Sequence, residues 1–290
     1  MNSNTMKIIT DNNALLAIIP NVINAVEGEK TLYDKLNPWL VTTEQWICDT
    51  FTGTEIMEQI ADDTDTAPWR ATAWQQVANV IACEAMRQAI PSLDLVLTPN
   101  GFGIVSNQNV APASKERVER LIGSMTARRD LMIEYLLDSL QQISEWKSTQ
   151  QCDWFCQTLL QSPRAAVLAV HGRTFDGDQW QEFLTLRDRA RPIEAVIAER
   201  WVSPELMVRL RTALVTPDAT SSEIDLALKV RDCVFAELAG QPRRHAMLDR
   251  IVNYVRKRPD TFPEWTNSDT ARLFDPPVFR NKKDSSGYFF

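Results

Sequence analysis

Residues 93–122, "LDLVLTPNGFGIVSNQNVAPASKERVERLI", interrupt a chain whose other segments show apolar residues at helical spacing. This stretch holds two of the nine glycines, Gly101 and Gly103. Every second residue from 93 to 97 is leucine, and Asn100-Gly101 supplies the positive φ angles that a type I′ turn requires. We therefore expect a β-hairpin over about residues 93–106. A lone hairpin is only marginally stable, so it should pack on helices or pair with another chain.

The same stretch then starts a long helix. Ser114 is a favourable N-cap residue, and apolar residues recur at helical spacing from Val118 as far as Trp146. A helix of this length would span about 50 Å at 1.5 Å per residue. We expect it to connect two parts of the molecule.

The composition favours a mainly α protein: 44% of the 290 residues are hydrophobic and glycine is scarce. We expect helical bundles with one inserted hairpin and an extended C-terminal tail. The expected domains are an N-terminal helical domain over 1–149, a second helical domain over 150–265, and the tail over 266–290. No repeat of fixed period is evident.

The sequence contains no apolar run long enough for a membrane span and no signal-peptide core at its N-terminus, so we expect no membrane partner.

Helix start and stop signals support the helical class. Asp11 can cap a first helix, and Ser203-Pro204-Glu205 and Thr220 mark two later starts. Gly240 follows the last apolar residue of the helix after Thr220 and predicts its C-terminal end.

Charge is unevenly distributed within a net charge of −7. Residues 1–66 carry 3 basic and 11 acidic side chains, whereas residues 241–290 carry 10 basic and 6 acidic ones. Such opposite poles could let copies meet head to tail, although solvated helix faces of different charge explain them as well.

Basic residues cluster in three places, which are Arg187/Arg189/Arg191, Arg243/Arg244 and Arg256/Lys257/Arg258. Acidic residues interrupt the first cluster, and no aromatic platform accompanies the other two. We therefore expect solvated helix faces and no specific nucleic-acid partner.

No catalytic, cofactor or metal signature emerges. The five cysteines are scattered, which favours free thiols, and Cys152 and Cys156 lack further ligands for a metal. The aspartates of "DDTD" (62–65) and "FDGDQW" (175–180) lack the terminal Glu of a calcium loop, so we assign them turn and cap roles. His171 precedes a glycine and should end a helix. We therefore expect no catalytic residues and no cofactor, and interpret the chain as not an enzyme.

The C-terminal segment differs from the rest. Pro276-Pro277 imposes an extended path, and Tyr288, Phe289 and Phe290 are costly to leave in water because each can bury about 150–250 Å². We expect these aromatic residues to dock on this subunit or on a neighbour. Together with Asn100, Gly101, Phe102 and Gly103 they are the candidate interaction residues.

Three segments carry a resemblance, namely "LVLTPNGFGIVSNQNVAPASKERVERLI" (95–122), "LRDRARPIEAVIAERWVSPELMVRL" (186–210) and "FRNKKDSSGYFF" (279–290). They resemble a prophage-encoded family similar to virion structural proteins of the head–tail adaptor or head-completion kind. The resemblance implies a non-catalytic subunit that forms a ring-shaped oligomer with itself and contacts portal or tail proteins. It would be located in the bacterial host cytoplasm during assembly and then in the virion.

Two other interpretations remain open from the sequence. One is a helical enzyme or small-ligand-binding protein of unrecognised chemistry, which a buried pocket with converging charged residues would favour. The other is a regulatory helical module that binds another protein.

Overall fold

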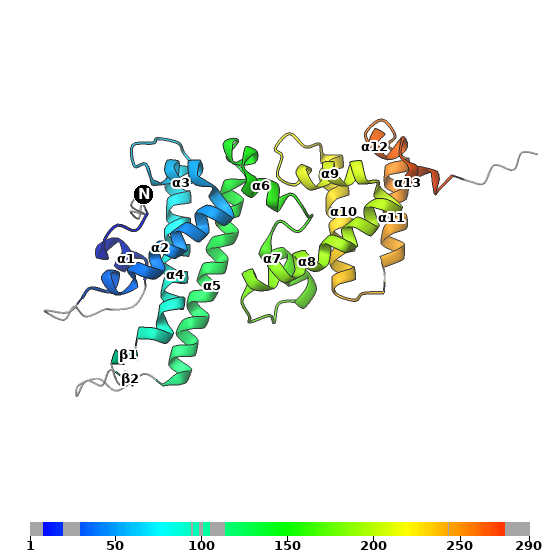
Figure 1. The fold of residues 1–290 in the computed structure, drawn as a ribbon. Coiled ribbons are helices and arrows are strands. Elements are labelled where there is room, and N and C mark those ends of the chain that lie inside the picture. Colours follow the sequence, from blue (N-terminus) through cyan, green and yellow to red (C-terminus); the bar gives the residue numbers. More distant parts are fainter. Residues whose placement is uncertain are drawn as a thin grey trace, which may run out of the picture. The chain divides into compact units, whose positions relative to one another are not determined.

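The computed structural model describes residues 8–19, 30–93, 95–98, 101–104, 114–242 and 244–275 (Figure 1). The chain is mainly helical and forms two compact units, residues 1–187 and 188–290. The boundary that we expected near residue 150 falls inside the first unit. The reason is that α5 and α7 are in contact, with the backbone N–H of Arg164 donating to Glu134 of α5 at 3.1 Å.

The first unit is built around two long helices, α4 and α5, which lie side by side (Figure 1). Small apolar residues on two faces of α4, among them Ala78, Val80 and Ala85, are fully buried, so α4 can pack closely against α5 and α2 at once. The elements in chain order are α1 (Asn12–Ile18), α2 (Leu32–Ile47), η1 (Cys48–Thr52), α3 (Thr54–Ala61), α4 (Arg70–Leu93), β1 (Leu95–Thr98), β2 (Gly101–Ile104), α5 (Lys115–Leu140), η2 (Glu145–Ser148), α6 (Gln150–Phe155), α7 (Pro163–His171) and the start of α8 (Gln179–Ile197).

The second unit contains the remainder of α8 and a smaller set of helices around α10. These are η3 (Ala198–Val202), α9 (Pro204–Ala213), α10 (Ser221–Leu238), α11 (Arg244–Arg256), α12 (Pro263–Thr266) and α13 (Asp269–Arg272). Helix α10 packs against α9 and α11. None of the described helices is long and apolar enough to cross a membrane.

The two units share a local structure that we did not expect, since no repeat was evident in the sequence. In each unit a long helix ends in a π-helical turn, η1 or η3, and a residue with positive φ starts the next helix. That residue is Gly53 (φ 75°) in the first unit and Ser203 (φ 80°) in the second, 150 positions later. The corresponding segments, "ICDTFTGTEIM" (47–57) and "IAERWVSPELM" (197–207), share few identical residues, so the repeat is visible mainly in the backbone.

The similarity between the two units continues after their next two long helices. The indole N–H of Trp146 donates to the carbonyl of Phe51 at 2.6 Å, and that of Trp265 donates to the carbonyl of Trp201 at 2.8 Å. Phe51 and Trp201 occupy the same place in η1 and η3. Three residues after each tryptophan, a Thr or Ser hydroxyl caps the next short helix. The two units therefore share one order of local structures, which is a long helix, a π-helical turn, a helix that starts at a positive-φ residue, and a later tryptophan bound to the π-helical turn. We call each of the two copies a repeat.

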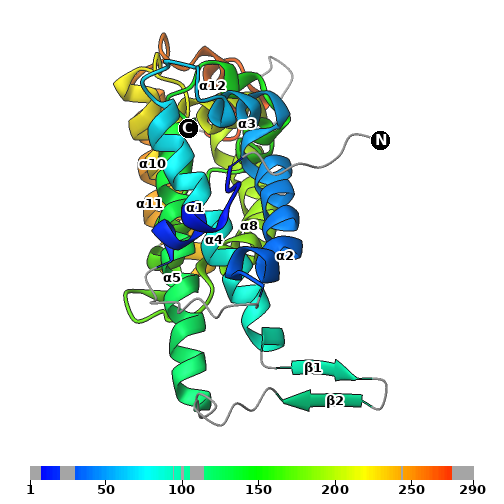
Figure 2. The ribbon, with the colours of Figure 1, turned by 90° about the vertical axis from the view of Figure 1, so that its left-hand side faces the viewer.

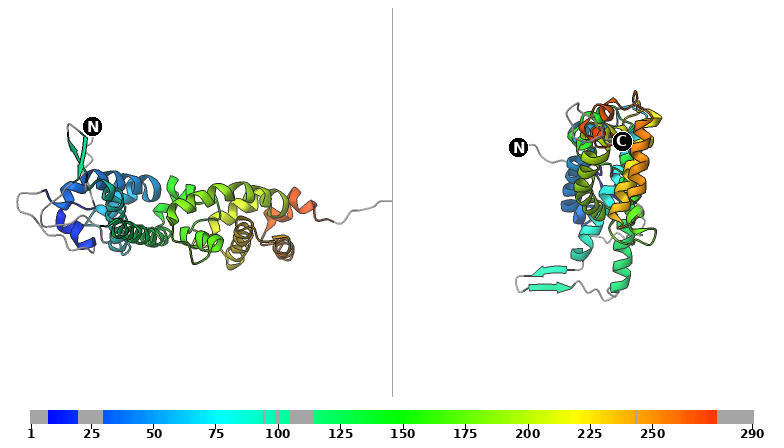
Figure 3. Two further views of the ribbon diagram at one scale, coloured as in Figure 1. Left: turned by 90° about the horizontal axis from the view of Figure 1, so that it is seen from below. Right: turned by 90° about the vertical axis from the view of Figure 1, so that its right-hand side faces the viewer.

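The strands β1 and β2 stand where the second unit has only a short turn. Helices α10 and α11 are joined through residues 239–243, whereas residues 94–114 separate α4 from α5. Leu95 pairs with Ile104 and Thr98 with Gly101 in antiparallel register. Figures 2 and 3 show the two strands at one end of α4 and α5, pointing away from the helices of this unit.

The long helix is shorter than expected. Helix α5 ends at Leu140, and Trp146 lies in η2 because its buried indole is held by the carbonyl of Phe51. Ser114 is the N-cap residue of α5, but its side chain accepts no capping hydrogen bond. Helix α5 packs along α4 within the first unit, so the prediction that it connects two parts of the molecule was wrong.

Several expected caps are confirmed. The carboxylate of Asp11 accepts from the N–H of Ala14, and the Ser203 hydroxyl accepts from the N–H of Leu206. Thr220 forms a capping box with Glu223. Gly240 has φ 66° and ends α10 in a Schellman motif, in which the N–H of residue 241 donates to the carbonyl of residue 236.

The tail begins later than expected. Residues 269–272 form α13, whose first turn is capped by Ser268, so the segment from 266 to 272 is not extended. Residues 276–290 lie outside the described residues, and the expected extended path of Pro276-Pro277 lies there too.

Candidate functional site

An aromatic cluster closes the end of the first unit. The ring of Phe51 in η1 lies 4.8 Å from that of Trp180 at the start of α8 and 6.1 Å from that of Phe155 in α6. Trp154 contacts Phe155 edge to face at 4.8 Å and lies 6.5 Å from Trp180. The start of α8 is thereby packed over α6 and η1.

Arg187 also packs on this aromatic cluster. We expected Arg187 to lie on a solvated basic face, and for this residue the expectation was wrong. Its side chain is only 1% exposed, and its guanidinium lies 3.9 Å from the centre of the Trp154 ring. It donates to the carbonyls of Trp154 and Leu160 at 2.5 and 3.0 Å. A guanidinium that satisfies carbonyls at a helix end and stacks on an indole is stabilised although it is buried. The neighbouring Arg189 also binds a carbonyl, that of Leu238.

A pocket of about 450 Å³ opens beside this cluster. Its lining combines three indoles with one carboxylate and two amides, from the residues Trp46, Asp49, Thr50, Gln150, Gln151, Trp154, Trp180 and Leu184. The amide of Gln151 donates to the carbonyl of Asp49 at 3.1 Å and so ties α6 to η1.

A buried ionic network holds the start of α8 from the other side. Arg129 of α5 donates to Glu84 of α4 at 2.8 Å and to both Asp130 and Asp178 at 2.6 Å, and its side chain is 2% exposed. Asp130 also accepts from the N–H of Gln179, at the first residue of α8. The network therefore links α4, α5 and α8 within the first unit.

Burial and pairing act against each other on the carboxylates of this network. Burial raises the pKa of Glu84, but hydrogen bonds from Arg87, Gln88 and Arg129 outweigh it and lower the pKa to about 2. For Asp130 burial prevails over the charge of Arg129, and its pKa is raised. Burial also disfavours the charged form of Arg129, but the surrounding carboxylates more than offset this and raise its pKa.

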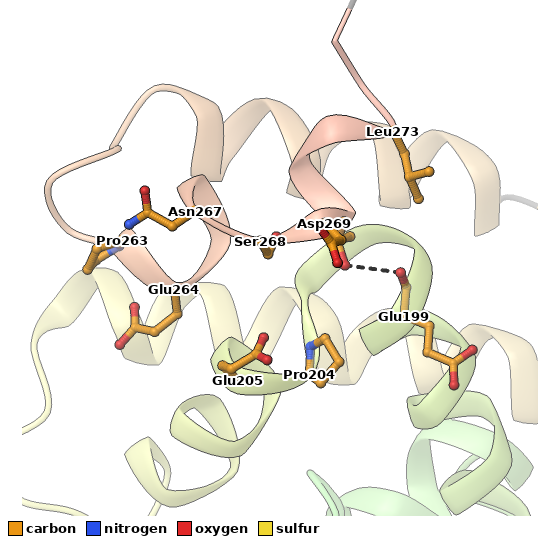
Figure 4. A pocket seen from close by; sticks show the side chains of 10 residues that line it. Glu199, Pro204, Glu205, Pro263, Glu264, Asn267, Ser268, Asp269 and Leu273 are labelled. Atoms are coloured by element: carbon orange, nitrogen blue, oxygen red, sulfur yellow. Dashed lines mark hydrogen bonds between the residues drawn. The ribbon is translucent and has the colours of Figure 1, made fainter.

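The second unit carries a larger cavity, of about 770 Å³, at the equivalent end (Figure 4). Acidic and apolar residues surround it: Glu199, Pro204, Glu205, Pro263, Glu264, Asn267, Ser268, Asp269, Thr270 and Leu273. The dashed line in Figure 4 is the bond from the Thr270 hydroxyl to the carbonyl of Glu199, 3.0 Å long. We call this cavity the acidic pocket.

The acidic pocket occupies the same place in its repeat as the tryptophan-lined pocket does in the first. Thr270 binds the carbonyl of Glu199 as Gln151 binds that of Asp49. Counting from the equivalent residues Trp146 and Trp265, Leu273 stands at the position of Trp154. The two equivalent side chains differ in exposure. Leu273 is 67% exposed, whereas the ring of Trp154 is covered by the guanidinium of Arg187.

Three of the candidate interaction residues lie in the described part of the chain. Gly101, Phe102 and Gly103 form three of the four residues of β2. Asn100 and the segment Tyr288, Phe289 and Phe290 lie outside the described residues.

The residues that we assigned structural roles behave accordingly. Asp178 caps α8 through the N–H of Gln181, and Asp62 accepts from the N–H of Thr64 in a turn. His171 ends α7 and binds Glu182 at 2.7 Å. Within the described part of the chain, no group of three His, Cys, Asp or Glu side chains is placed to hold a metal ion.

Sequence reasoning missed the buried network and the acidic pocket. Arg129 and Asp130 sit in a helix rich in charged residues, and nothing in the local pattern distinguishes them from exposed ones. The equivalent segments 47–57 and 197–207 share too few identical residues for the sequence alone to have pointed to the acidic pocket.

Comparison with protein families matches residues 19–156 and 241–274 to the Family of unknown function (DUF6712). The first block contains η1, the hairpin and Trp146, and the second contains Trp265 and α13. No curated protein and no solved structure shows a significant match to the chain. Because the two matched blocks cover more than half of the sequence, the chain belongs to the DUF6712 family.

Proposed function

We propose that this protein is a non-catalytic structural or assembly subunit of a phage virion, of the head–tail adaptor kind. It would assemble with copies of itself and contact portal or tail proteins. Its site of action would be the host cytoplasm during assembly and then the virion.

The observation that carries this proposal is the hairpin of β1 and β2. The second repeat joins the equivalent helices through residues 239–243, so the helix pair does not need a hairpin to connect it. None of the described helices makes more than a marginal contact with either strand. An isolated two-stranded hairpin is marginally stable, and its open edges are suited to pairing with a strand of another chain.

Two features of the sequence add support. Three segments resemble prophage-encoded virion proteins, and one of them contains the hairpin. The acidic balance of residues 1–66 and the basic balance of residues 241–290 suit a heterologous contact, in which different surfaces of two copies meet and a ring can close.

The test compares the full chain with a variant in which residues 94–113 are replaced by the short link of the second repeat, residues 239–243. Sedimentation velocity would be run on each protein alone and after mixing with a purified phage portal protein. We expect assembly by the full chain and a monomer for the variant, with equal helix content by circular dichroism. Strictly monomeric and unbound behaviour of the full chain would overturn the proposal.

The tryptophan-lined pocket supports one alternative, a small-ligand-binding protein. Three indoles with a carboxylate and two amides can enclose and orient a small polar molecule. Native mass spectrometry of the purified chain decides between the two: a co-purified small molecule, lost on substitution of Trp46 by Ala, would favour the alternative.

A further inference from the structure

We propose that the acidic pocket of the second unit is the docking site of the basic, aromatic segment 276–290 of the same chain. This inference stands apart from the assembly role. It concerns how the end of the second repeat is covered, and it holds or fails whether or not the protein forms a ring.

The first unit provides the precedent. There the chain that follows α6 returns as α8, and it covers the end of the repeat with an aromatic residue, Trp180, and a cation, Arg187. With that cover in place Phe155 is only 1% exposed, whereas Phe274, its equivalent in the second unit, is half-buried. Among the described residues of the second unit no such cover is present, and Leu273 remains 67% exposed beside the cavity.

The segment that follows α13 has the composition that such a cover requires. It contains Phe279 and Arg280 in sequence, then Lys282 and Lys283, with a single acidic residue, Asp284. The pocket offers the complementary chemistry, which is apolar surface on prolines and Leu273 and four carboxylates around it. Opposite charges at this short range favour docking of this segment over an acidic one.

Two of the four carboxylates have neighbours of their own. Glu264 binds Arg209 at 2.9 Å and Asp269 binds Arg272 at 2.6 Å. Glu199 and Glu205 are exposed and take part in none of the ion pairs of the described residues. We therefore assign Glu199 and Glu205 as the partners of the basic side chains.

The distance along the chain allows docking on the same subunit. Leu273 lines the pocket, and Figure 4 shows the chain leaving the pocket at that residue. Phe279 follows six positions later, and an extended chain covers up to about 20 Å over that interval. That is enough to turn back over a cavity of this size.

Limited trypsin digestion of the full chain tests the proposal, because trypsin cuts after Arg280, Lys282 and Lys283. Cleavage would be located by mass spectrometry and timed against a free peptide of residues 276–290. We expect cleavage in the full chain to be about tenfold slower than in the peptide, since a docked segment is cut only when it opens. Double substitution Glu199→Gln and Glu205→Gln should bring the rate to that of the peptide.

The matched control removes two exposed acids of the same unit that lie outside the pocket, Asp218→Asn and Asp249→Asn, and should keep the protection. Circular dichroism establishes that each variant is folded. Equal cleavage of the wild-type chain and the peptide overturns the proposal, and so does protection that survives the pocket substitutions. Protection that increases with protein concentration would assign the segment to a second copy and overturn docking on the same chain.

Discussion

Substitution of Arg129 by Met provides the sharpest test of how the first unit is held together. Methionine keeps an unbranched apolar stem of similar length and removes the charge. The substitution breaks contacts of 2.8 Å to Glu84 and 2.6 Å to Asp130 and Asp178. Glu84 and Asp130 are then left 5% and 6% exposed without their central cation.

The expected loss follows from this burial. Removal of one partner from a buried ion pair typically costs about 3–5 kcal/mol of unfolding free energy, because the remaining charge is not solvated. Arg87 and Gln88 still donate to Glu84, which favours the lower end of that range. We expect R129M to be about 3 kcal/mol less stable than the wild type at pH 7.

The pH dependence provides an internal check. The pKa of Glu84 falls from 4.5 to about 2 on folding, so its charge stabilises the fold above pH 4.5, and this contribution is lost as the pH falls from 4.5 towards 2. A difference of this size corresponds to about 3 kcal/mol. In R129M the pKa of Glu84 should rise, so less of this contribution exists to be lost. The difference in unfolding free energy between wild type and variant should therefore be largest above pH 5 and should decrease below pH 4.5.

Urea unfolding followed by tryptophan fluorescence measures this difference at pH 7 and pH 4. Seven of the nine tryptophans lie in residues 1–187, so the signal reports mainly on the first unit. The control is R117M, an exposed arginine on the same helix, for which a change within about 0.5 kcal/mol is expected. A loss below about 1 kcal/mol for R129M at pH 7, or a difference that is the same at both pH values, would refute the reasoning.

Three further predictions follow from the repeat. W146F removes the donor to the Phe51 carbonyl and leaves a gap in a fully buried site, so it should cost about 2–3 kcal/mol in chemical unfolding, and an unchanged midpoint would contradict this. S203G should raise the unfolding free energy by up to about 1 kcal/mol, because glycine tolerates φ 80°. Glycine also replaces Ser as an N-cap residue at a cost of only about a few tenths of a kcal/mol. The reverse exchange in the other repeat, G53S, should cost about 1–3 kcal/mol, and the two thermal midpoints should shift in opposite directions.

Much of the local structure followed from short-range physics. Asp11, Thr220 and Gly240 mark helix ends because a capping side chain or a left-handed glycine satisfies backbone groups within a few residues. The mainly α class follows from apolar spacing in the same way. The predicted extent of the long helix failed at its C-terminal end because the carbonyl that holds Trp146 is distant in sequence.

The sequence alone thus determined the fold class and several helix starts, since those depend on interactions between residues three to five positions apart. Only the tertiary structure decided which charged residues are buried. Arg129 and Arg187 look like ordinary surface arginines in the sequence, yet both are buried because partners 27 to 49 positions away surround them. The repeat was hidden for the same reason: its two copies conserve a backbone path and side-chain-to-carbonyl bonds, whose acceptor is a group that every residue carries.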